Sequence, residues 1–173
     1  MADRILVVDD ERIIRESIAF VLKKEGYAVA EASNGKEALD KFIADSFDLV
    51  ITDLEMPEMK GLELLDGVMH VNPQSMVVII TAYGSLDTAI AALRKGASDY
   101  ILKPIEFDEL LVKIQRLLEY RKLVMENQFL RRELQVLSHL RGPDRWVLKC
   151  PQHLEQLGPL MATFPDATVA FTL

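Results

Sequence analysis

The sequence predicts an α/β protein built on a doubly wound, five-stranded parallel sheet. Short apolar segments alternate with amphipathic segments from residue 4 to residue 102, as they do in consecutive strand–helix units. Three of the apolar segments, residues 5–8, 49–51 and 77–80, contain no polar side chain. Continuously apolar strands are typical of a parallel sheet covered by helices on both faces, so these three belong in its middle.

Two further predicted strands, residues 27–32 and 98–102, mix polar and apolar side chains. Mixed composition suits strands near the edges, and the order 2-1-3-4-5, the flavodoxin-like arrangement, places them there. Four amphipathic helices are predicted between the strands from apolar residues at helical spacing. These residues are Ile13, Ile14, Ile18, Val21, Leu22, Ala38, Leu39, Phe42, Ile43, Leu62, Leu65, Met69, Ala89, Ile90 and Leu93. Four glycines are interpreted as residues that begin or end these elements: Gly26, Gly35, Gly61 and Gly96.

Length, charge and cysteine content limit the function classes. A chain of 173 residues is long enough for one domain and an appendage. Its net charge of −7 argues against direct nucleic-acid binding, which requires clustered Lys and Arg. Cys150 is the only cysteine, and neither a signal peptide nor a membrane-spanning apolar run is recognisable. We therefore expect a cytoplasmic protein without membrane contact.

Polar residues follow four of the predicted strands at the point where each ends. Asp9 and Asp10 follow the first strand, Asp53 the third, Thr81 the fourth and Lys103 the fifth. The carboxyl ends of parallel strands meet at one edge, where ligands bind near the reversal of strand order. Three carboxylates brought together there repel one another unless a hard cation compensates, and oxygen ligands favour Mg²⁺.

These residue types also suit phosphoryl transfer. Asp53 is the candidate nucleophile, the Thr81 hydroxyl can donate a hydrogen bond to a phosphoryl oxygen, and the Lys103 ammonium can neutralise phosphoryl charge. Taken singly, an Asp or Thr at a strand end is more often a helix cap or a turn residue. Their joint occurrence at the ends of several strands favours the functional interpretation.

Four motifs, "VVDD", "ITDLEMPEMKG", "IITAYGS" and "DYILKP", occur in the order typical of a response-regulator receiver domain. Residues 1 to about 120 resemble that family, and "ENQFLRREL" further resembles the linker helix of NtrC-type regulators. The resemblance implies that Asp53 accepts a phosphoryl group from a sensor histidine kinase. It also implies a phosphoacceptor signalling domain that assists only its own phosphorylation and dephosphorylation, rather than an enzyme acting on other substrates.

The same resemblance assigns roles to the remaining site residues. Asp9, Asp10 and Asp53 would hold Mg²⁺ together with the backbone carbonyl of Glu55. Thr81 and Tyr100 would form the switch, with Thr81 drawn to the phosphoryl group as the Tyr100 ring turns inward. A Tyr at residue 100 could equally be an aromatic cover for the sheet edge. The family's cis peptide would fall between Lys103 and Pro104, although X-Pro bonds are generally trans.

After Pro104 the helical pattern continues from residue 107 to residue 137 without an internal Pro or Gly. Its second half fits the heptads of a parallel two-stranded coiled coil, with Asn127 fixing the register and Glu126 facing Arg131 of the other helix. The predicted seam comprises Tyr120, Asn127 and Leu134 at a positions and Leu123, Leu130 and Leu137 at d positions. The alternative is a single helix whose leucines pack on their own domain.

Three regions are thus predicted: a receiver domain over residues 1–120, a linker helix over 121–141, and a strand–helix–strand tail over 142–173. The tail resembles an incomplete sulfotransferase-family fragment around "WVLKCPQHLEQLGPLMATFPDA" and would be a fused or truncated segment. The predicted function is a two-component response regulator that switches conformation or dimerisation on phosphorylation. The alternatives are a truncated sulfotransferase-like protein, which lacks a loop for the donor's phosphate, and a non-phosphorylated coiled-coil scaffold, which needs none of the pocket residues.

Overall fold

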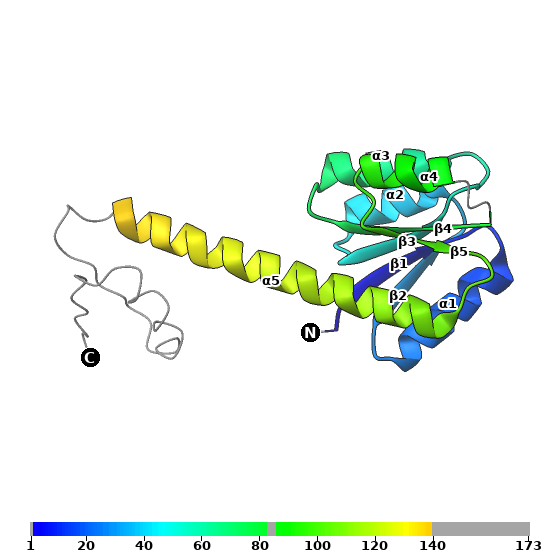
Figure 1. Cartoon of the computed structure of the whole chain (residues 1–173), viewed down its shortest axis with the longest axis horizontal. Helices are drawn as coiled ribbons and strands as arrows, with labels where there is room; N and C mark the ends of the chain where they lie inside the picture. The colour runs from blue at the N-terminus through cyan, green and yellow to red at the C-terminus, as the bar shows by residue number, and fades with distance from the viewer. Residues whose placement is uncertain (1, 83–85, 140–173) are drawn as a thin grey trace. The chain divides into compact units, whose positions relative to one another are not determined.

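The computed structural model describes residues 2–82 and 86–139 of the chain. One parallel sheet carries five strands in the order β2-β1-β3-β4-β5 (Figure 1). The strands are β1 (Arg4–Val8), β2 (Ala28–Ala32), β3 (Leu49–Asp53), β4 (Met76–Thr81) and β5 (Asp99–Leu102). The order reverses between β1 and β3, so the predicted fold class and strand order are confirmed.

Helices cover both faces of the sheet. They are α1 (Arg12–Lys24), α2 (Gly35–Ala44), α3 (Gly61–Val71), α4 (Leu86–Arg94) and α5 (Phe107–His139). Figure 1 shows α2, α3 and α4 on one face, and α1 with the first turns of α5 on the other. The long final helix predicted over residues 107–137 is therefore confirmed.

Alternate residues of the central strand β3 enter two separate cores. Val50 lies opposite Leu6 and Val77, and all three pack beneath α2 and α3. The next residue, Ile51, points to the other core, which α1 and α5 close with Ile18, Leu110 and Ile114. Because successive strand residues point to opposite faces, a strand covered on both sides must be apolar throughout. This explains the continuously apolar segments of the sequence.

The apolar residues at helical spacing are not all buried. The side chain of Ile13 is 81% exposed, and those of Ile43 and Leu93 are exposed as well. Each helix lies on a sheet that contacts only one stripe of its surface, so apolar residues at the margin of that stripe remain in water. The helices were predicted correctly, and the buried part of each is narrower than its set of apolar residues.

The chain divides after Lys122 into two units, and α5 contributes to both. The first unit ends where Arg121 pairs with Asp48 and Lys122 Nζ lies 2.8 Å from an oxygen of Asp3. In the second unit, α5 exposes large apolar side chains that include Leu123 and Leu130. Within residues 2–82 and 86–139, no helix combines the length and the apolar character needed to cross a membrane.

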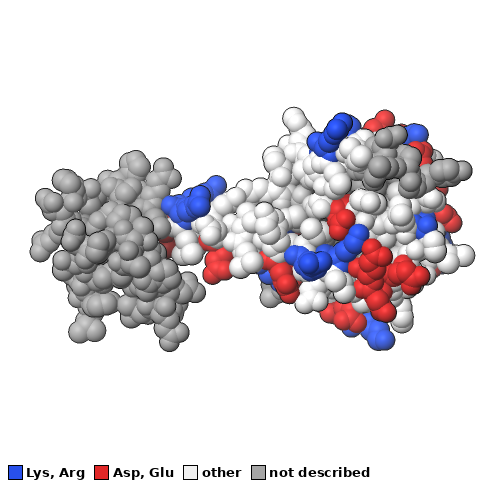
Figure 2. All heavy atoms as spheres, in the orientation of Figure 1, with Lys and Arg blue, Asp and Glu red and all other residues white. Residues whose placement is uncertain are grey.

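Charged side chains of both signs lie on the surface of the described part. Figure 2 shows Asp and Glu gathered on the visible face over the end of the first unit that carries α1 and the beginning of α5.

Candidate functional site

Asp53 is the last residue of β3 and lies at the carboxyl edge of the sheet. Its side chain is buried between the neighbouring strand ends. The backbone N–H of Leu54 donates to Asp53 Oδ1 at 2.7 Å, and Lys103 Nζ donates to Oδ2 at 2.8 Å. Both carboxylate oxygens are therefore held, and the group has a defined orientation.

Asp9 and Asp10 follow β1, the strand next to β3. Asp9 is buried, and its Oδ1 accepts a hydrogen bond from the Glu11 N–H at 2.8 Å. Asp10 is exposed. Oxygens of Asp9, Asp10 and Asp53 all lie within 4.8 Å of one another, so the three predicted carboxylates form one cluster. Burial raises the pKa of Asp9, because the charged form loses hydration.

Lys103 neutralises part of this cluster. It follows β5, and the peptide bond between Lys103 and Pro104 is cis, as the family resemblance implied. Its Nζ lies 3.1 Å from Asp9 Oδ2 and 3.6 Å from Glu11 Oε1, in addition to the bond to Asp53. Burial alone would lower the pKa of the ammonium, but the hydrogen bonds to Asp53 and Asp9 outweigh it, so the pKa is raised. Three carboxylates against one ammonium leave the pocket negative.

The structure also places the other predicted residues around this edge. Thr81 ends β4 and is buried, and its carbonyl accepts the Lys103 N–H at 2.8 Å. Tyr100 lies on β5 and is half-buried; Lys113 of α5 donates to its carbonyl at 2.8 Å, with Nζ 5.6 Å from the ring centroid. Glu55 is exposed, and its side chain accepts a hydrogen bond from Lys60 at 2.9 Å.

Comparison with known proteins identifies the family of this chain. A family model described as the response regulator receiver domain matches residues 5–115. The chain belongs to that family. Two-component signalling is therefore the function of this receiver domain, in keeping with the acidic cluster at its sheet edge.

Relatives of two kinds match the receiver domain. It is 44% identical over 119 residues to the transcriptional regulatory protein ZraR of Klebsiella oxytoca, an alignment that covers 69% of this chain and 27% of ZraR. It is 40% identical over 119 residues to the chemotaxis protein CheY of Bacillus subtilis, covering 68% of this chain and 99% of CheY. The chain thus spans less than a third of the length of the first relative and nearly all of the second.

Solved structures agree with the fold. A response regulator receiver domain from Clostridium thermocellum superposes with a TM-score of 0.67 at 37% identity, covering 70% of this chain and 98% of that chain. The response regulator TrrA from Thermotoga maritima, solved in complex with Mg²⁺-BeF, superposes with a TM-score of 0.62 at 40% identity, covering 66% and 98%.

Sequence reasoning missed a steric requirement behind Asp53. Gly61, interpreted from the sequence only as a residue at the end of an element, begins α3. A Cβ there would lie 2.1 Å from the carbonyl oxygen of Asp53. The Gly61 N–H donates to the Leu54 carbonyl at 2.9 Å, which closes the loop between β3 and α3. Glu58 in this loop has a φ of 66°, and the sequence carried no signal for that left-handed residue. The available signal for Gly61 was its place at the end of "DLEMPEMKG".

The predicted tail, residues 142–173, lies outside the described residues, and the family match does not reach it. The side chains of Leu134 and Leu137 in the predicted seam also lie outside the described part. Tyr120, Leu123, Asn127 and Leu130 are all described and all exposed. The Asn127 Oδ1 accepts a hydrogen bond from Arg131 Nε of the same helix at 3.1 Å.

Proposed function

We propose that this receiver domain accepts a phosphoryl group on Asp53 from a sensor histidine kinase in the cytoplasm, in a Mg²⁺-dependent reaction, and relays the signal by changing conformation or dimerisation. The observation that carries the proposal is the placement of Asp53 within the carboxylate cluster, 2.8 Å from the Lys103 ammonium. An Asp that served only as a turn residue at the end of a strand would need neither the other carboxylates nor the Lys103 ammonium beside it.

The donor set fits Mg²⁺. Asp9, Asp10 and Asp53 offer hard oxygens within 4.8 Å of one another, and one or two protein carboxylates with waters and phosphate are the usual environment of this cation. These three residues would hold the ion, with the Glu55 backbone carbonyl as a further ligand. When bound, Mg²⁺ would neutralise charge on the carboxylates and on the incoming phosphoryl oxygens.

The protein's own groups supply orientation and charge. In the proposed step an oxygen of Asp53 forms a bond to phosphorus while the bond to the donor's histidine nitrogen breaks, and that nitrogen keeps the electron pair. The Leu54 N–H fixes the rotation of the Asp53 carboxylate. Lys103 offsets charge on the phosphoryl oxygens, and the Thr81 hydroxyl donates to one of them.

The output is proposed to pass through the switch pair and α5. Tyr100 is linked to this helix by Lys113, which contacts both the Tyr100 carbonyl and its ring. An inward turn of the ring, following Thr81, would remove the ring from that ammonium and alter the packing of β5 against α5. A shift of this kind between two existing states is how local modification of a domain changes a distant surface.

We propose a homodimer formed through the α5 seam defined above, Tyr120, Leu123, Asn127, Leu130, Leu134 and Leu137. Leu123 is 65% exposed and Leu130 39% exposed in the single chain, so both present apolar surface that a second copy could cover. Pairing with a second copy would remove both from water, and a buried Asn127 pair would fix a parallel register.

Intact mass after incubation with acetyl phosphate and Mg²⁺ tests the phosphoacceptor. The wild-type chain should gain one phosphoryl group, and EDTA should prevent the gain. Asp53→Asn should gain none, whereas Asp66→Asn, which changes an exposed carboxylate paired with Lys95, should react as the wild type does. Equal modification of Asp53→Asn would refute the assignment of Asp53.

A further inference from the structure

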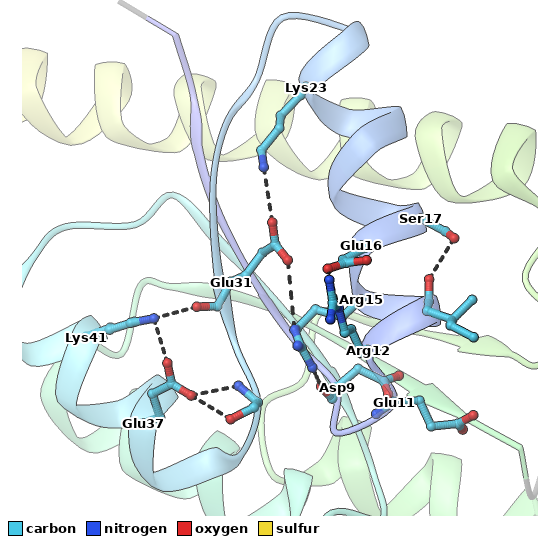
Figure 3. Close-up of polar contacts among 12 residues, drawn as sticks. Asp9, Glu11, Arg12, Arg15, Glu16, Ser17, Lys23, Glu31, Glu37 and Lys41 are labelled. Atoms are coloured by element: carbon cyan, nitrogen blue, oxygen red, sulfur yellow. Dashed lines mark hydrogen bonds and ion pairs between the residues drawn. The ribbon is translucent and has the colours of Figure 1, made fainter.

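Arg15 links α1 to the end of β1, outside the set of residues already assigned to the pocket. Its side chain is only 14% exposed. Its Nη1 donates to the backbone carbonyl of Asp9 at 2.6 Å, and its Nε lies 3.8 Å from Glu31 Oε2 (Figure 3). One guanidinium thus joins an acid on β2 to the turn that carries Asp9 and Asp10.

With this contact, the polar groups of Asp9 are held from several directions. Its N–H donates to the Ala32 carbonyl at 3.3 Å, its carboxylate contacts the Glu11 N–H and Lys103, and its carbonyl is held by Arg15. That carbonyl belongs to the peptide unit from which Asp10 continues. Fixing the plane of this peptide leaves the φ of Asp10 as the one backbone rotation that sets the direction of its side chain.

Arg15 is itself held by charged neighbours (Figure 3). Glu31 also pairs with Lys23 at 3.0 Å, and the Glu31 carbonyl accepts a hydrogen bond from Lys41 at 2.6 Å. The acid that faces Arg15 is therefore fixed through its backbone as well as its side chain. A planar guanidinium can reach the Glu31 carboxylate and the Asp9 carbonyl at once, which a single ammonium cannot do in the same geometry.

We propose that Arg15 is a positioning residue that holds the turn carrying Asp9 and Asp10 in the geometry required for Mg²⁺ binding. The inference rests on the proposed function, since it concerns the same pocket. A cation beside a metal site would by its charge alone weaken binding of a second cation. The contribution of Arg15 is accordingly its orientation of the backbone, with Glu31 offsetting its charge.

The same helix supplies a matched control. Arg12 lies one turn earlier, is 76% exposed, and its Nε bonds only to Glu16 at 2.7 Å among the contacts described for it. Replacing Arg12 removes the same charge from α1 without removing a hydrogen bond to the Asp9 carbonyl. Comparing the two positions separates loss of orientation from loss of positive charge.

The test measures the Mg²⁺ dissociation constant by calorimetry for the full chain. Arg15→Gln and Arg15→Lys should both weaken binding about tenfold, the usual effect of removing a group that orients a metal ligand, whereas Arg12→Gln should stay within about twofold of wild type. Without metal, amide exchange at Glu11 should accelerate in both Arg15 variants. Leu64 lies in α3, and its backbone N–H donates to the carbonyl of Lys60, the residue before this helix. Amide exchange at Leu64 should not change, which would report that the fold is intact.

Two results would overturn the inference alone. One is wild-type Mg²⁺ affinity in Arg15→Gln, and the other is wild-type Mg²⁺ affinity in Arg15→Lys, which keeps the charge but lacks the planar guanidinium. Should Arg15→Gln fail to fold, Arg15→Lys decides the question by itself. Absence of Mg²⁺ binding by wild-type protein would instead overturn the proposed function, and the inference with it.

Discussion

Replacing Gly61 with alanine is expected to disturb the pocket from behind Asp53. The new Cβ would lie 2.1 Å from the Asp53 carbonyl oxygen and 2.9 Å from the Leu54 Cα. Restoring a carbon–oxygen separation of about 3.3 Å requires the backbone to move by about 1 Å. Because the obstruction is backbone rather than a side-chain tip, we expect the upper end of the usual overpacking cost, about 3 kcal/mol. The melting temperature should fall by roughly 10 °C for a domain of this size.

Gly67→Ala is the matched control, because it makes the same change six residues later in α3. There a Cβ would meet only the tip of the Leu39 side chain, at 3.1 Å, and alanine favours the helix by about 1 kcal/mol. Urea unfolding followed by circular dichroism should place this variant within about 1 kcal/mol of wild type. Phosphorylation by acetyl phosphate should be impaired in Gly61→Ala alone. A Gly61→Ala protein as stable as Gly67→Ala would refute the steric argument.

Three further predictions concern stability, acid sensitivity and assembly. Ile114→Ala should cost about 3 kcal/mol in urea unfolding, because Ile114 is fully buried against the sheet, whereas exposed Val112→Ala should change little. The pKa of Glu37 is lowered to about 2 by its hydrogen bonds to Lys41 and Ser33, so its contribution is present above pH 4.5 and is lost as pH falls from 4.5 to 2. Since the side chain is 38% exposed, we expect the free energy of unfolding of wild type to exceed that of Glu37→Gln by only about 1 kcal/mol at pH 7. Unfolding curves measured between pH 4.5 and pH 2 should show this difference disappearing as the pH falls. Leu123→Asn should shift sedimentation velocity profiles toward monomer, and Met125→Asn, an exposed residue of the same helix outside the seam, should not; dimers that persist in Leu123→Asn would contradict the seam.

Much of the fold followed from local rules in the sequence. The strands could be predicted because Val50 and Ile51 face different cores and must both be apolar. Asp53 and Thr81 could be placed at one edge because the carboxyl ends of parallel strands always meet. The cis bond before Pro104 came from the family resemblance, since the general preference of X-Pro bonds pointed to trans.

What could not be predicted depends on contacts between distant segments. The spacing of apolar residues predicted the helix that contains Ile13, but it could not show that the sheet leaves this side chain exposed. Gly61 is needed because the carbonyl of Asp53, the last residue of β3, lies against it; the place of this glycine at the end of "DLEMPEMKG" indicates a turn but not how closely the two backbones approach. Likewise, Arg15 and Arg12 are indistinguishable in sequence; only folding brings Glu31 and the Asp9 carbonyl to one of them.

The pairing of Arg121 with Asp48 and of Lys122 with Asp3 has a practical consequence for anyone recombining this protein. Asp48 also accepts the backbone N–H of Arg4 at 2.7 Å, so the first strand and the last turn of the unit are fastened to the same carboxylate. A chimaera spliced at residue 120 would discard both cations and leave the amino-terminal strand with a weakened anchor. Foreign output modules should therefore be joined after Lys122, where the receiver keeps its own closing contacts.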